Sequence, residues 1–282
     1  MKPRKQCIFC GSIAGLSKEH FWPEWLSAYL PTPDPYSHVA EFHSAEGKQP
    51  QRLQRRSERP GAVYTRKIRA VCAKCNSGWM SALETEVKPA VVALIGDQSM
   101  PISRGSVASL SRWVAVKTMV AEHSTEDAAL TPPEDRRAVR TGVIPSYFRI
   151  FAALHTLETK TAYYRQSTTL SRSIRGPEPP LPDGISRNVQ VTAFLLGPVF
   201  FYITAARIAF FNADILDPVH AMYRLWPEPA NGTIVQPLPP LESLQVAAIS
   251  QSLDRLVQDP RVWYGGPRRR STRYKPGTLV TE

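Results

Sequence analysis

The sequence predicts an α+β protein in which a small N-terminal cysteine finger precedes a larger α+β domain with a mainly antiparallel sheet. Three observations support this prediction. All four cysteines of the chain fall in two CxxC pairs near the N-terminus. Apolar residues recur at helical spacing directly after the second pair. Runs of aromatic and β-branched residues, typical of strands, dominate the second half.

The finger is predicted to span residues 1–98. Within it, residues 31–62 are rich in Pro, Ser, Gln and Arg, which predicts a long insertion with little regular structure. After Val71, apolar residues spaced three or four positions apart predict a helix through Trp79, Leu83, Val87, Val91 and Leu94. Since proline cannot donate a backbone hydrogen bond, Pro89 predicts a kink or a break into two helices.

The second domain is predicted to span residues 99–265, beyond a boundary at Gly96–Ser103. Ser106–Glu122 is expected to form an amphipathic helix, with one side made by Leu110, Trp113, Val114, Lys117 and Val120. Pro132–Thr141 is expected to form a shorter helix, because it has proline at its start and acidic residues in its first turn.

Strands are expected where aromatic and β-branched residues are concentrated, at Phe148–Leu154, Thr161–Thr168, Val189–Leu196 and Val199–Ile208. The Gly197-Pro198 pair indicates a hairpin between the last two. Proline-rich loops at 177–182 and 227–240 separate the pieces. Residues 266–282 form a basic tail that we expect to be flexible.

The charge balance favours a polyanionic partner. The formal net charge is +11, which points to nucleic acid before an anionic membrane. Eight basic residues and one acidic residue, Glu58, lie between Lys48 and Arg69. From this stretch we select as candidate phosphate ligands Arg52, Arg55, Arg56, Arg66 and Arg69. A solvated loop is the alternative reading of such a charge run.

Membrane insertion and export are not expected. No apolar run approaches the roughly 18 residues that a membrane span needs. The first residues, MKPRKQCIFCG, are basic but lack an apolar stretch behind them, which argues against a secretory signal. We therefore expect a cytoplasmic protein that does not associate with membranes.

The two CxxC pairs, Cys7/Cys10 and Cys72/Cys75, predict one structural zinc site. A two-residue gap lets two thiolates bind the same ion, and zinc prefers four tetrahedral ligands. The second pair stands where a helix begins, which gives a treble-clef arrangement. Redox pairs, disulfides and buried cysteines are the alternatives, and disulfides are disfavoured without an export signal. The 61 residues between the pairs indicate an inserted element.

The motifs around these cysteines resemble the HNH (His-Me finger) endonucleases. The resemblance lies in the order CxxC, acid–His, Pro and CxxCN, carried by Cys7, Cys10, Glu19, His20, Pro23, Cys72, Cys75 and Asn76. The longer patterns EHxxPxWL and CxxCNxGWMxxLE look like a zinc-binding subgroup of that family. The resemblance covers residues 5–88 and implies a ββα-metal finger.

What the resemblance implies is a one-metal phosphodiesterase acting on DNA, with RNA as a further candidate. His20 would be the general base, and Glu19 with Asn76 would ligate Mg²⁺ or Mn²⁺. The zinc would be purely structural, since four thiolates leave no open position. A helix N-cap is the alternative role for Asn76.

Two alternative functions stay open at the level of sequence. Nuclease fingers of this type usually carry a middle Asn that orients the catalytic histidine, and this chain has no Asn between His20 and Cys72. A zinc-stabilised module that binds nucleic acid without cutting it is therefore the second hypothesis. A zinc-stapled module for protein–protein interaction is the third. The oligomeric state is left open by the sequence.

Overall fold

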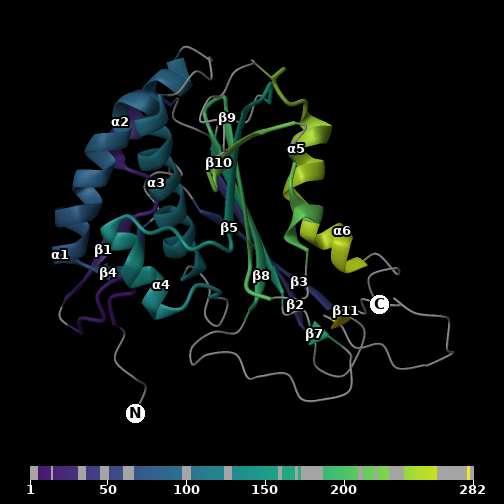
Figure 1. Ribbon diagram of the computed structural model, residues 1–282, viewed down its shortest axis with the longest axis horizontal. Coiled ribbons are helices and arrows are strands. Elements are labelled where there is room, and N and C mark those ends of the chain that lie inside the picture. The colour runs from purple at the N-terminus through teal and green to yellow at the C-terminus, as the bar shows by residue number, and fades with distance from the viewer. Residues whose placement is uncertain are drawn as a thin grey trace, which may run out of the picture.

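The structure is a computed structural model. It describes residues 6–13, 15–30, 36–44, 51–59, 67–96, 103–123, 129–157, 161–168, 171–172, 187–208, 212–218, 221–228, 238–258 and 278–279. Three layers are visible in Figure 1, with helices α2 and α3 on one face of a central sheet and helices α5 and α6 on the other. The predicted α+β class with an antiparallel sheet is confirmed.

The N-terminal part is a β-hairpin followed by a helix. Its described elements are β1 (Leu16–His20), the 3-10 helix η1 (Glu24–Ala28), β2 (Tyr36–Ser44), β3 (Gln51–Arg59), β4 (Lys67–Cys72), α1 (Ala73–Cys75), the π-helical turn η3 (Asn76–Met80) and α2 (Ser81–Gly96). Strands β1 and β4 pair antiparallel, with a bulge between Ser17 and Glu19. The chain therefore folds back on itself directly before the helix.

The predicted insertion at 31–62 is not irregular throughout, so this prediction is corrected. Its described residues form two nine-residue strands, β2 and β3, which pair antiparallel from Tyr36 opposite Arg59 to Ser44 opposite Gln51. Strand β2 also lies beside β6 of the central sheet. Tyr36, Val39 and Phe42 are residues that favour strands, and they were a signal for β2. The polar composition of residues 31–62 outweighed this signal in the prediction.

Of the two outcomes predicted at Pro89, a kink or a break, the break into two helices is wrong, because α2 runs without interruption from Ser81 to Gly96. Pro89 lies on the exposed side of the helix, while Val87 and Val91 are buried on the other side. Packing of the buried side holds the helix together although one backbone hydrogen bond is lost. The irregular turn comes earlier, at Gly78, where φ is −95° and ψ is −112°.

The second part contains α3 (Arg104–Glu122), α4 (Pro133–Ala138) and η4 (Val139–Thr141), as expected from the sequence. Trp113, Val114 and Lys117 are buried, as predicted, but so is most of the helix circumference. Helix α3 packs between α2 and the sheet strands β5 and β10 (Figure 1). It is therefore an internal helix rather than a surface one.

The central sheet has the order β10-β5-β9-β8-β6, and all its pairings are antiparallel. Its strands are β5 (Phe148–Leu154), β6 (Thr161–Thr168), β8 (Val189–Leu196), β9 (Val199–Ala206) and β10 (Tyr223–Trp226). The hairpin at Gly197-Pro198 is confirmed by the pairing of Leu196 with Val199. Strand β10 and the helices α5 (Ser243–Ser250) and α6 (Ser252–Gln258) were not predicted.

One hydrophobic core connects the finger with the sheet. It includes Phe21 and Trp22 after β1, Trp113 of α3 and Phe194 of β8. A second core lies on the other sheet face, under α5 and α6. Among the helices that the structure describes, none combines the length and the apolar character needed to cross a membrane.

The C-terminal tail predicted at 266–282 lies almost entirely outside the described residues. The exception is β11 (Thr278–Leu279), which pairs parallel with β7 (Ser171–Arg172). One further short element, the 3-10 helix η5 (Ala213–Leu216), follows β9.

Candidate metal centre

Four cysteine side chains meet at one point of the finger. The Sγ atoms of Cys7, Cys10, Cys72 and Cys75 all lie within 4.8 Å of one another, and Cys10 Sγ lies 3.6 Å from Cys72 Sγ. A tetrahedral ion with bonds of roughly 2.3 Å would hold sulfur atoms roughly 3.8 Å apart. All four are free cysteines. The cluster is thus compatible with one structural metal ion such as zinc.

The first pair sits on a tight turn. The Cys7 carbonyl accepts a hydrogen bond from the Gly11 amide at 2.8 Å, and Gly11 has a left-handed φ of 75° that glycine adopts without strain. The Ile8 amide donates to the Ala70 carbonyl at 3.0 Å. This bond fastens the turn to β4, so the two cysteine pairs approach each other.

The second pair lies where β4 ends and the helix begins. Cys72 is the last residue of β4 and the N-cap of α1, and Cys75 is the last residue of α1. The amides at the start of a helix carry partial positive charge, which stabilises a thiolate. The predicted arrangement, with one pair on a turn and one at a helix start, is confirmed.

The protonation of these thiols shows why a cation suits the site. Burial raises the pKa of Cys75 to about 12. At Cys7 burial also raises the pKa, but amide donors led by that of Cys72 outweigh it and lower the value to about 7. Four adjacent thiolates repel one another, so a bound metal ion would supply the charge that lets all four deprotonate.

Helix α4 clamps this turn from outside. Arg136 of α4 donates from Nε to the Ile8 carbonyl at 3.0 Å and from Nη1 to the Thr131 carbonyl at 2.6 Å. Below the turn, the Phe9 ring meets the Trp79 ring edge-on at 5.1 Å. The finger is therefore held by the rest of the chain as well as by its own hairpin.

The predicted catalytic pair occupies the end of β1. His20 is the last residue of the strand and lies opposite Lys67, and Glu19 lies opposite Ile68. His20 is half-buried, whereas the Glu19 side chain lies outside the described part of the structure. The hairpin thus brings the backbone of the acid–His pair to the strand that leads into the second cysteine pair.

Asn76 follows Cys75 directly and reaches back to the same strand. Its Nδ2 donates to Ser17 Oγ at 3.4 Å, and Ser17 Oγ donates to the Val71 carbonyl at 3.0 Å. Cys72 rather than Asn76 is the N-cap of the first helical turn, so the N-cap alternative for Asn76 is wrong. The Asn76 side chain instead links the helix start to β1, two residues before Glu19.

The environment of His20 includes an ion pair that sequence reasoning missed. Burial lowers the pKa of His20, as do Lys67 and Lys117, while Glu24 and Glu84 raise it. Lys117 Nζ lies 2.8 Å from Glu84 Oε1, and the Lys117 side chain is only 1% exposed. The sequence feature that could have indicated this ion pair was the position of Lys117 on the apolar side of α3.

The candidate phosphate ligands are only partly described. Arg52, Arg55 and Arg56 lie on strand β3, whose backbone the structure describes but whose side chains it does not. Arg69 is exposed on β4, and Arg66 lies outside the described residues. The described part of the basic stretch therefore lies on two strands, β3 and β4.

Comparisons with protein-family models, with curated proteins and with solved structures found no match for this chain. The functional proposal therefore depends on the chemistry of the residues themselves, above all on the cysteine cluster near the start of β1 and on Glu19-His20 at the other end of that strand.

Proposed function

We propose that the protein is a metal-dependent HNH-type endonuclease that hydrolyses phosphodiester bonds in DNA. One observation carries the proposal. The four cysteines join a β-hairpin to a helix start, and the hairpin ends in Glu19-His20 while the helix start carries Asn76. This is the strand–strand–helix order that the motifs imply. In the proposal a zinc ion bound by the four cysteines is structural.

His20 is the proposed general base. Burial and two lysines favour the neutral imidazole, which is the form that accepts a proton from water. The water oxygen then attacks phosphorus while the bond to the leaving oxygen breaks. When bound, a divalent ion such as Mg²⁺ or Mn²⁺ would stabilise the charge on the phosphate and the leaving oxygen. Glu19 and Asn76 are the residues that would hold it.

The distribution of positive charge supports a nucleic-acid substrate. Arginines occur repeatedly along β3, which is inserted between the two halves of the finger, and Lys67 and Arg69 are exposed on β4. Strand β4 pairs with the strand that ends in His20. Phosphate contacts from these strands would hold the backbone of DNA next to the proposed base.

Two carboxamide substitutions test the metal-binding part of the proposal. We compare Glu19→Gln with Glu24→Gln, because each removes one carboxylate. Glu19 precedes His20 in the sequence and Glu24 raises the pKa of His20, but only Glu19 belongs to the proposed ion site. Plasmid cleavage by Glu19→Gln should fall at least ~100-fold at fixed Mn²⁺, while Glu24→Gln should cleave within a few-fold of the parent. Equal rates for the two variants would contradict the role of Glu19.

A second candidate function is a zinc-stabilised module that binds nucleic acid without cutting it. One contact favours it: the Asn76 amide already donates to Ser17, so this side chain has a structural partner. The chain also lacks an Asn between His20 and Cys72 that would orient the histidine. Salt-sensitive retardation of plasmid without cleavage under any divalent metal would identify this function.

A further inference from the structure

A buried arginine connects the turn that carries Cys7 and Cys10 to a segment between α3 and α4. Arg136 is 8% exposed, and its guanidinium donates to the Ile8 carbonyl on one side and to the Thr131 carbonyl on the other. Hydrogen bonds from a charged donor are about twice as strong as those between neutral groups. Arg136 therefore fastens the cysteine turn to residues 130–131.

Glu122, the last residue of α3, holds this segment from its other side. Its side chain is fully buried, and two donors meet each of its carboxylate oxygens. Oε2 accepts from the Leu130 amide at 3.2 Å and the Thr131 amide at 2.9 Å, and Oε1 accepts from Thr131 Oγ1 at 2.7 Å and Gln190 Nε2 at 2.8 Å. An ionised carboxylate only accepts hydrogen bonds, so these four donors suit it.

The hydrogen bonds continue into the central sheet. Gln190 of β8 is fully buried, and its Oε1 accepts from Arg165 of β6, at 3.3 Å from Nε and 2.9 Å from Nη2. Arg136 and Ile8 are 128 residues apart in the chain, and Glu122 and Gln190 are 68 apart, so these bonds join distant parts of the fold. We call the five side chains the buried network: Arg136, Thr131, Glu122, Gln190 and Arg165.

The cysteine turn has little regular structure of its own. Residues 8–10 form a turn, and no helix or strand is assigned between residues 6 and 13. Ile8 lies between the two cysteines, and its amide donates to the Ala70 carbonyl of β4 while its carbonyl accepts from Arg136, both at 3.0 Å. Because the four sulfur atoms must meet around one ion, the position of this turn decides how well they can bind it.

We propose that Arg136 and Glu122 are positioning residues of the metal centre, which hold the first cysteine turn where its sulfur atoms meet those of the second pair and so raise the affinity of the cluster for zinc. Groups behind the direct ligands commonly contribute roughly 10- to 100-fold to metal affinity. The predicted finger, residues 1–98, would then need residues outside it to bind zinc with full affinity. This proposal concerns the cysteine cluster and does not rest on nuclease activity.

Two substitutions of Arg136 test the first part of the proposal. Zinc affinity of the full-length protein is measured by competition with a chelator, well below the melting temperature. Arg136→Met keeps most of the apolar stem but removes both hydrogen bonds, so zinc affinity should fall roughly 10- to 100-fold. Arg136→Lys keeps the charge and can reach one of the two carbonyls, so it should restore part of the affinity.

A substitution at Glu122 tests the second part. In Glu122→Gln one acceptor oxygen becomes an amide donor, so that two of the four donors lose their partner. Arg136 keeps its bond to Ile8, but residues 130–131 are held less firmly. Zinc affinity should fall less than in Arg136→Met, toward the lower end of the same range. Visible absorption of the cobalt-substituted variants shows whether four thiolates still surround the ion.

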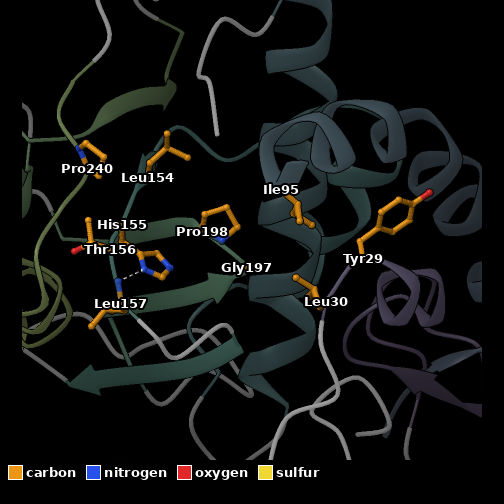
Figure 2. A pocket seen from close by; sticks show the side chains of 10 residues that line it. All are labelled: Tyr29, Leu30, Ile95, Leu154, His155, Thr156, Leu157, Gly197, Pro198 and Pro240. Carbon is orange, nitrogen blue, oxygen red and sulfur yellow. Dashed lines mark hydrogen bonds between the residues drawn. The ribbon is translucent and has the colours of Figure 1, made fainter. Parts of the chain in front are cut away.

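The control removes a buried polar contact outside the network. His155 is 6% exposed, and its Nδ1 accepts from the Leu157 amide at 3.0 Å. Figure 2 shows His155 with Ile95 in the lining of a cavity near the C-terminal end of α2, whereas Cys75 precedes the N-terminal end of that helix. His155→Phe should therefore lower the melting temperature without changing zinc affinity.

Three results would overturn the proposal. One is parental zinc affinity in a folded Arg136→Met variant. Another is a loss of affinity in His155→Phe equal to that in Arg136→Met at a similar melting temperature, because general destabilisation would then explain both. The third is a parent protein that binds no zinc. If Arg136→Met fails to fold, parental affinity in both Arg136→Lys and Glu122→Gln is equally decisive. Absence of plasmid cleavage leaves the proposal intact, since zinc affinity is measured without a substrate.

Discussion

Lys117 of α3 and Glu84 of α2 form an ion pair, with 2.8 Å between Nζ and Oε1, where these two helices pack together. The two partners differ in environment, because the Lys117 side chain is 1% exposed and that of Glu84 is 22% exposed. The pair joins two helices that are also linked by a hydrogen bond from Ser109 Oγ of α3 to the Glu86 carboxylate of α2. It also lies close enough to His20 to influence its pKa.

This asymmetry predicts unequal effects of removing each partner. Glu84→Gln weakens the compensation of a buried ammonium group, and should lower the free energy of unfolding by about 2 kcal/mol. Lys117→Met keeps the volume of the stem and leaves a carboxylate that water can reach, so about 1 kcal/mol or less is expected. Urea unfolding of the two variants measures both values. If Lys117→Met lowers the free energy of unfolding more than Glu84→Gln does, the unpaired buried ammonium group is not the main cause of the destabilisation.

The cysteine cluster predicts that metal content and folding depend on each other. The parent should contain one zinc per chain by elemental analysis, and Cys75→Ser should lose it. Because a structural zinc site contributes folding free energy directly, Cys75→Ser should also melt at a clearly lower temperature. Treatment of the parent with a strong chelator should have the same effect. A Cys75→Ser variant that keeps its zinc and its melting temperature would exclude a shared four-cysteine site.

The β8–β9 turn predicts opposite results for two glycine substitutions. Gly197→Ala should destabilise the protein by about 1–3 kcal/mol, because φ is 61° and the new Cβ would lie 3.0 Å from Leu30 Cδ2. Gly105→Ala, in the first turn of α3 with no atom within 4 Å of the added Cβ, should be neutral or stabilising by less than ~1 kcal/mol. Thermal unfolding of both variants compares them. Similar losses at the two positions would refute the close approach at Gly197.

His123 predicts a specific loss of stability in acid. Burial, with the charges of Arg136 and Arg165, lowers its pKa from 6.5 to about 3. The unfolded chain takes up a proton below pH 6.5 that the folded chain does not, so the free energy of unfolding falls as pH drops from 6.5 toward 3. One such group contributes up to ~1.4 kcal/mol per pH unit.

The His123→Gln variant isolates this contribution. Other groups also titrate in this range, but they are common to both proteins. The pH dependence of the unfolding free energy should therefore be shallower in His123→Gln between pH 6.5 and 4. Parallel curves for the parent and the variant would mean that His123 is protonated in the folded protein.

Local patterns in the sequence were sufficient for part of this architecture. The two CxxC pairs predicted the cysteine cluster, because two-residue spacing needs only a tight turn or a helix start. Four strands of the sheet were found because aromatic and β-branched residues are concentrated in them, and helix α3 because its apolar residues recur at helical spacing. In each case the information lies within a few residues of the element.

The features that sequence reasoning missed depend on contacts between distant segments. Strand β3 is rich in arginine and glutamine, and pairs with β2 in a hairpin that also lies beside β6. Strand β10 has only four residues and is defined by its pairing with β5. The Lys117–Glu84 pair forms across 33 residues, where α2 and α3 meet. Periodic patterns in the sequence do not predict a contact between residues of two different helices.

The most direct test of the proposed function is cleavage of supercoiled plasmid by the parent protein and by His20→Ala. Both zinc-loaded proteins are assayed side by side with Mg²⁺, with Mn²⁺ and with a chelator of weakly bound metal. Metal-dependent nicking by the parent, lost in His20→Ala without a change in zinc content or melting temperature, is the predicted result. Nicking by His20→Ala at the parent rate would contradict the role of His20, and absence of nicking by the parent under every condition would contradict the nuclease itself.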